Sequence, residues 1–215
     1  MKYKIFAGIC LLLIAIFVGT SYYYKKEQAQ MYGQLARNSD PVFVRDHSRI
    51  LGSPDARVTI VEFMDPACET CALFSPLVKQ VMAANPGRIK LVIRYAPFHD
   101  GADTFVKILE AAGKQGKYWE TLDAMFMSQP HWASHHNPQP ERVWEFLPAV
   151  GLDMARLKTD MNDPEFARRI SQDVADAATL NVRKTPGFFV NGRPLEPFSR
   201  QNLINLINEE LKTQY

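Results

Sequence analysis

An apolar segment that leads directly into a pair of cysteines constrains this chain more than any other feature. Val58 to Met64 (VTIVEFM) is rich in β-branched and apolar residues and follows a Gly-Ser-Pro-Asp turn, which is typical of a buried strand. Cys68 and Cys71 come next, and the apolar residues beyond them recur at helical spacing until an Asn-Pro-Gly sequence. We therefore predict a strand that passes into a helix at the cysteines.

The rest of the domain is expected to contain few strands and much helix. Residues 88–98 predict a second strand, and residues 101–182 have an almost wholly helical pattern. Residues 187–191 predict a short strand that an Asn-Gly turn joins to a partner at 193–195, and Ser199 is expected to cap a last helix. At 215 residues and 47% apolar side chains, the chain can fill one hydrophobic core.

The first residues have a different character, because residues 5–24 contain no charged side chain. A helix of that length crosses a hydrocarbon layer about 30 Å thick, so we expect residues 1–24 to form an uncleaved membrane anchor. A cleaved signal peptide is the alternative, but no small-residue cleavage site follows. Residues 25–41 are polar and are expected to form a stalk or a short surface helix, and residues 42–215 the folded domain.

Charge helps little with function or orientation. The net charge is +2, and the sequence contains no basic stripe and no run of like charges, so nucleic acid is not an expected partner. Lys and Arg residues occur in nearly equal number on both sides of the apolar segment, so they do not decide which side of a membrane the domain occupies.

The cysteine pair has three possible uses. A zinc site needs four ligands, but the sequence has no second pair of this kind and no histidine at ligand spacing from this one. A structural disulfide that closes so small a loop removes little entropy from the unfolded chain. A redox role has support from position: at the start of a helix, Cys68 lies where the dipole stabilises a thiolate and lowers its pKa, and Cys71, one turn later, can resolve a mixed disulfide.

Three segments together resemble the DsbA-like thiol:disulfide interchange proteins of the thioredoxin superfamily. They are the strand before the cysteines, the helix with Pro76 after them, and KTPGFFVNG at residues 184–192. The resemblance covers about Leu51 to the C-terminus. It implies an α/β thioredoxin fold with an inserted helical subdomain at about 101–182, and no cofactor.

The resemblance also implies roles for individual residues. Pro186 corresponds to the family's cis-proline and Thr185 to the residue whose backbone pairs with an extended substrate. Glu62 matches the buried acid that shuttles protons for the inner cysteine, although a surface-facing carboxylate is the alternative. His99 ends a strand and could approach the active face, or it could be an ordinary loop histidine. Three further histidines, His131, His135 and His136, could bind copper or zinc, but their loop has no defined ligand geometry.

The sequence departs from the family between the cysteines and after the proline. Glu69 and Thr70 stand where strong oxidants carry Pro-His or Pro-Tyr. A carboxylate beside Cys68 should raise the pKa of the thiol and make the couple less oxidising, so Glu69 and Thr70 are expected to tune the redox potential. Gly187 replaces a β-branched residue and could loosen or open the substrate groove.

We expect a membrane-anchored thiol:disulfide oxidoreductase that acts on cysteines of exported proteins, in the direction of disulfide formation. A reductase or isomerase is an alternative, and a redox-inactive copper-binding module is another. The resemblance implies a domain in the bacterial periplasm or another extracytoplasmic space, held by a single inner-membrane helix near a membrane redox partner.

Overall fold

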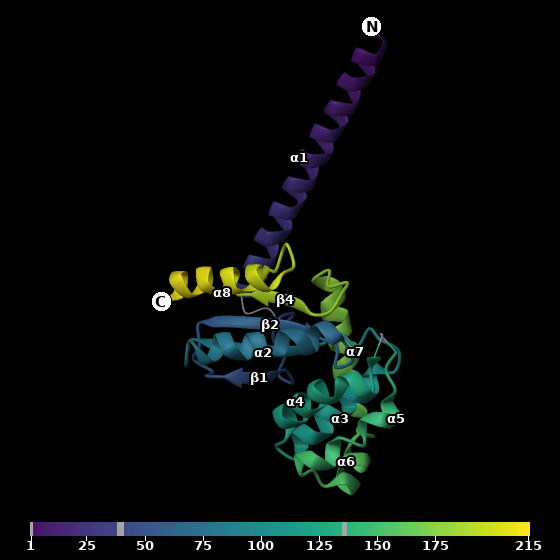
Figure 1. Ribbon diagram of the computed structural model, residues 1–215. Helices are drawn as coiled ribbons and strands as arrows, with labels where there is room; N and C mark the ends of the chain where they lie inside the picture. The colour runs from purple at the N-terminus through teal and green to yellow at the C-terminus, as the bar shows by residue number, and fades with distance from the viewer. Residues whose placement is uncertain (1, 38–40, 135–136) are drawn as a thin grey trace.

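The computed structural model describes residues 2–37, 41–134 and 137–215 (Figure 1). A mixed sheet of five strands forms its centre, in the order β1-β3-β2-β4-β5. The strands are β1 (Arg49–Gly52), β2 (Val58–Met64), β3 (Ile89–Tyr95), β4 (Gly187–Val190) and β5 (Arg193–Pro194). β2 and β3 are parallel, and the other neighbours are antiparallel. Of these strands, β2 to β5 confirm the sequence prediction, whereas β1 is a four-residue edge strand that the sequence did not predict.

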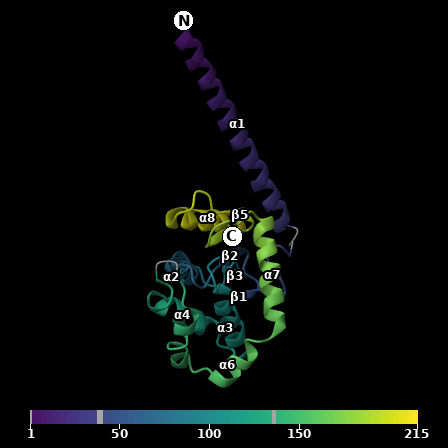
Figure 2. The same ribbon diagram turned by 90° about the vertical axis from the view of Figure 1, so that its right-hand side faces the viewer.

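Helices cover both faces of the sheet. α2 (Glu69–Ala83) and α8 (Arg200–Gln214) lie over one face, and α7 (Pro164–Thr179) lies over the other (Figure 2). Alternate residues of a strand point to opposite faces. Accordingly Ile60 and Met64 join the core cluster beneath α2 and α8, while Val61 and Phe63 join the cluster beneath α7. Glu62 shares the face of Ile60 and Met64, and therefore points toward α2.

The long interval between β3 and β4 is helical, as predicted. It contains α3 (Ala102–Lys114), α4 (Tyr118–Ser128), η1 (Gln129–His131), α5 (Pro140–Val143), η3 (Leu147–Val150), α6 (Met154–Asp160) and then α7. The described residues of this interval contain no strand. In Figure 1 the helices α3 to α6 form a group on the side of the sheet away from α1. This arrangement confirms a thioredoxin fold with an inserted helical subdomain.

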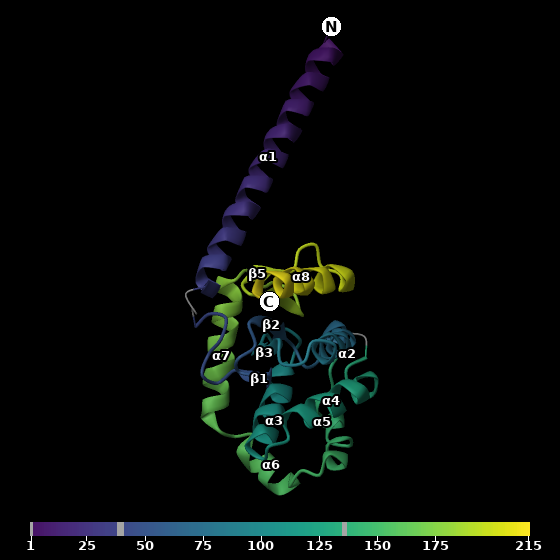
Figure 3. The same ribbon diagram turned by 90° about the vertical axis from the view of Figure 1, so that its left-hand side faces the viewer.

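One helix, α1 (Lys2–Arg37), replaces the predicted anchor and stalk, and it is long and apolar enough to cross a membrane. Its lower end reaches the domain beside α7 (Figure 3). There Tyr32 is buried, packs edge-on against Phe189 at 5.7 Å between ring centroids, and donates a hydrogen bond of 3.0 Å to the carbonyl of Leu180. The segment expected to be a polar stalk or short surface helix thus also contributes one buried aromatic residue, Tyr32, to the core. Residues 38–40 lie outside the described residues, and the domain boundary at residue 42 stays a prediction.

Candidate active site

Cys68 caps the N-terminus of α2. Its backbone is extended, α2 begins at Glu69, and the amide of Cys68 donates a 3.0 Å hydrogen bond to the carbonyl of Asp65. Both cysteines are free thiols; 5% of Cys68 is exposed and none of Cys71. The pair therefore presents one sulfur at the rim and holds the other inside, as expected for a nucleophile and a resolving cysteine.

The loop before β4 lies against the nucleophile. The Thr185–Pro186 peptide bond is cis, the isomer that the resemblance implies. The Cys68 thiol donates a hydrogen bond of 3.3 Å to the Thr185 carbonyl. Pairing of β4 with β2 sets this position, since Gly187 lies opposite Phe63. Segments 117 residues apart in the sequence thus meet at one sulfur.

The two thiols have opposite acidities. The pKa of Cys68 is lowered to about 6, and the main cause is hydrogen bonding with the Cys71 thiol. Burial acts in the opposite direction. The Thr185 side chain and the backbone N–H groups of Cys71 and Thr70 lower the pKa further. Burial raises the pKa of Cys71 well above its usual value, and hydrogen bonding to Cys68 and the charge of Glu62 act in the same direction. Near neutral pH the pair therefore carries one thiolate, on Cys68, and one thiol, on Cys71.

Glu62 is buried rather than surface-facing. Only 3% of the residue is exposed, and its Oε1 has no hydrogen-bond partner among the described residues. Burial, and then the charge of Cys68, raise the pKa of Glu62 to about 8. A carboxyl group with this pKa is mostly protonated at neutral pH and can exchange a proton close to that pH. The charge of Glu62 interacts with both cysteines.

Asp65 is the site residue that sequence reasoning missed. It is fully buried, and its carboxylate accepts hydrogen bonds from the backbone N–H groups of Ala67, Phe98 and His99, at 2.7–2.9 Å. The same residue accepts the amide of Cys68 and lowers the pKa of Cys71 through its backbone N–H. Asp65 thereby connects the cysteine loop to the loop after β3. The signal was present in the Asp-Pro that follows the strand, but it resembles an ordinary turn.

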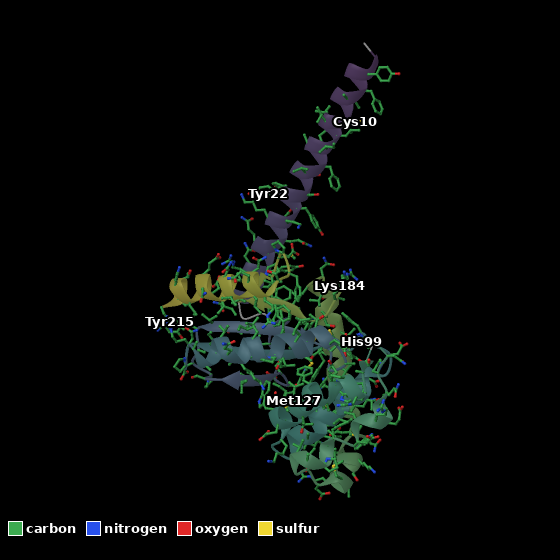
Figure 4. The ribbon with its side chains drawn as sticks, viewed as in Figure 1. Cys10, Tyr22, His99, Met127, Lys184 and Tyr215 are labelled. Carbon is green, nitrogen blue, oxygen red and sulfur yellow. The ribbon has the colours of Figure 1, made fainter. Side chains whose placement is uncertain are left out.

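His99 does reach this end of the sheet. Its Nδ1 lies 2.8 Å from the Asp65 carboxylate, and 18% of its side chain is exposed. Figure 4 places His99 and Lys184 at one end of the sheet and Tyr215 at the other. The imidazole is therefore held next to the cysteine loop through Asp65, and it is not an isolated loop residue.

The structure bears on two of the departures from the family. Glu69 is exposed and is not among the main influences on the pKa of Cys68, so the tuning of the redox potential by Glu69 and Thr70 stays a prediction. An exposed carboxylate is screened by water, whereas the thiol and amide groups act at short range. A Cβ at Gly187 would lie 2.7 Å from Cγ1 of Val182, so this side chain occupies the space next to the glycine, and a loosening of the substrate groove by Gly187 stays a prediction.

The histidine loop gives no support for a metal site. His131 stacks on Phe146, with ring centroids 5.4 Å apart. His135 and His136 lie outside the described residues. Across residues 2–37, 41–134 and 137–215, no group of three or more His, Cys, Asp or Glu side chains could hold a metal ion.

Known proteins place this geometry in a family. The thioredoxin family profile matches residues 45–209. The chain is 32% identical over 150 residues to a Na(+)/H(+) antiporter NhaA of Herminiimonas arsenicoxydans, a match that covers 70% of this chain and 23% of the antiporter. The chain thus spans about a quarter of the length of such curated relatives.

Solved structures agree with the fold. A thioredoxin-like oxidoreductase from Silicibacter pomeroyi is similar at a TM-score of 0.69 and 29% identity, over 81% of this chain and 97% of that one. The α-DsbA1 protein of Wolbachia pipientis is similar at a TM-score of 0.68 and 18% identity, over 78% and 92% of the two chains. With the cysteine pair at the start of α2, the cis-proline beside it and the helical subdomain between β3 and β4, this chain belongs to the thioredoxin family and has the DsbA-like form of its fold.

Proposed function

We propose that the protein is a thiol:disulfide oxidoreductase that forms disulfides in exported proteins. The observation that carries the proposal is the asymmetry of the pair: Cys68 is at the rim with a pKa lowered to about 6, and Cys71 is buried with a raised pKa. A sulfur of low pKa leaves readily from a mixed disulfide. An oxidised pair with this asymmetry is suited to passing its disulfide to a substrate.

The site residues supply each step. A substrate thiolate attacks Sγ of Cys68, the Cys68–Cys71 bond breaks, and its electron pair leaves on Cys71. Cys71 then takes up a proton, which Glu62 holds at neutral pH. A second substrate thiolate attacks the mixed disulfide, and Cys68 leaves as a thiolate. The substrate loses two electrons and the cysteine pair gains them.

Thr185 and Pro186 would position the substrate during these steps. The Thr185 carbonyl oxygen lies 3.3 Å from Sγ of Cys68, so the backbone on which an extended substrate would pair is directly beside the reacting sulfur. Holding two reactants in contact removes much of the entropic cost of their reaction.

Refolding and reduction assays test the direction of the reaction. The oxidised full chain should accelerate formation of native disulfides in reduced hirudin and should be a poor catalyst of insulin reduction, and Cys68→Ser should abolish the effect on hirudin. Efficient insulin reduction without disulfide formation would instead indicate a reductase. Absence of thiol activity together with tight Cu(I) binding would indicate the copper-binding module.

We further propose that α1 anchors the domain to the bacterial inner membrane with the domain in the periplasm. Apolar side chains in the upper turns of α1, such as Leu12 and Phe17, are exposed, and thiol oxidation belongs to oxidising compartments. A reduced pair must pass its electrons on, so the anchor would keep the domain close to a membrane redox partner. Protease added to spheroplasts should digest the domain, and protection from it would contradict this orientation.

A further inference from the structure

A groove lies between the loop that carries Pro186, the β4–β5 hairpin and the lower turns of α1. Its volume is about 620 Å³, and it is lined by Pro186 and Gly187 on one side and by Tyr22, Lys25 and other residues of α1 on another. Because α1 is fixed to the domain through Tyr32, the same helix that emerges toward the membrane forms a wall of the groove. The groove starts one residue from Thr185, whose carbonyl contacts Cys68.

Most charged residues that line the groove are basic. Two of the five basic residues have acidic partners: Lys25 lies 3.4 Å from Glu196, and Arg193 pairs with two glutamates of α8. The other three have no acidic partner in the part of the chain that the structure describes; they are Lys26, Arg183 and Lys184. Arg183 and Lys184 are exposed, and Figure 4 shows Lys184 on the side of the domain from which α1 rises.

Apolar side chains complete the groove. Pro186 and Phe188 are buried at its floor, and Phe198 is 48% exposed at its edge while its ring packs on Phe74 at 4.9 Å. An apolar floor with a basic rim suits an extended peptide that carries acidic side chains. A surface for anionic lipid headgroups needs only exposed cations, and would have no use for a floor that begins at the cis-proline.

We propose that this groove binds an acidic segment of the substrate that lies a few residues from the reacting cysteine. The inference rests on the proposed function and deepens it: exported proteins with acidic residues near a cysteine are the preferred substrates. Three cations without acidic partners at the rim attract carboxylates at short range and lose this effect at high salt.

Three cysteine peptides test the proposal on the oxidised full chain in phosphatidylcholine nanodiscs. The peptides differ only at positions three and four residues from the cysteine, which are Asp, Ser or Lys. Each rate of thiol–disulfide exchange is divided by the rate of the same peptide with Ellman's reagent, which removes differences in thiol reactivity. At low ionic strength the Asp peptide should react about tenfold faster than the Lys peptide, and about 0.5 M salt should remove most of the difference.

Charge reversal locates the effect. The variant Arg183→Glu/Lys184→Glu should reverse the order of the Asp and Lys peptides, whereas Lys212→Glu, which changes an exposed lysine at the far end of α8, should retain it. Equal corrected rates for the three peptides, or a preference for the Asp peptide that survives the charge reversal, would overturn the proposal that the groove binds acidic segments. If the reversal changes no peptide rate and instead weakens contact with phosphatidylglycerol nanodiscs, the cations bind lipid and the proposal also fails. Failure of the Ser peptide to react at all would refute the proposed function itself.

Discussion

Glu62 offers a test in which stability and catalysis should change together. The perturbation is Glu62→Gln, which keeps the shape of the side chain and removes its titration. The pKa of Glu62 is raised from 4.5 to about 8. Between pH 4.5 and pH 8, the folded protein therefore holds a proton on Glu62 that the unfolded chain has released. Stability contributed by this group is therefore greatest below pH 4.5 and is lost as the pH rises to 8. At about 1.4 kcal/mol per pH unit, the whole loss is about 5 kcal/mol.

The measurement is the free energy of unfolding of the reduced protein in urea, at about pH 5 and pH 8. Cys68 acts in the opposite direction between about 6 and 9, because its folded pKa is lowered, so the useful quantity is the difference between wild type and Glu62→Gln. From pH 5 to pH 8, the free energy of unfolding of the wild type should fall by about 3–4 kcal/mol relative to that of Glu62→Gln. The exposed Glu120→Gln serves as the control and should show no such change.

Catalysis should respond at the same site. If Glu62 supplies the proton that Cys71 takes up, Glu62→Gln should slow disulfide transfer to hirudin by about 10²-fold, the lower end of what a general acid contributes. The variant should also lose the part of the pH profile that reports a group titrating near 8. An unchanged pH profile would refute the relay, and an unchanged stability difference would refute the burial of a protonated carboxyl group.

Three other expected outcomes follow from the site geometry. Iodoacetamide should alkylate Cys68 with a midpoint near pH 6 and should not reach Cys71 in that range, as mass spectrometry of the labelled peptides would show; a midpoint near 9 would contradict the thiolate. Asp65→Asn should cost about 2 kcal/mol or more in urea unfolding and shift the alkylation midpoint of Cys68, since charge-assisted bonds are lost on the cysteine loop. Gly187→Val should cost about 1–3 kcal/mol, and Val182→Ala in the same chain should recover part of it; no recovery would mean that another contact is responsible.

Local patterns in the sequence were enough to predict the parts of the fold that repeat over several residues. The strand Val58–Met64 is a continuous apolar run, and the helix that begins at Glu69 and the helices before Gly187 have a periodic core face. The cysteine pair and the distant Thr185-Pro186 could be assigned to one site because both belong to the family resemblance. In the structure, Sγ of Cys68 lies 3.3 Å from the carbonyl oxygen of Thr185.

The missed features depend on contacts far apart in the sequence. β1 has only four residues, too few for a pattern to stand out. Asp65 looks like a turn residue until the loop after β3 is placed on its carboxylate. Tyr32 looks like part of a polar stalk until Phe189 and Leu180 are brought to it. In each case the partner, and not the local sequence, determines the role.

A trapped mixed disulfide tests the central claim most directly. In Cys71→Ser the remaining site thiolate, on Cys68, should attack a peptide disulfide, release one peptide thiolate and stay linked to the other half, because no resolving cysteine is present. Mass spectrometry should find that peptide on Cys68. The matched variant Cys68→Ser, whose remaining site thiol is buried and has a raised pKa, should trap none at neutral pH. A peptide linked to Cys71 in the second variant, or none linked to Cys68 in the first, would contradict the account.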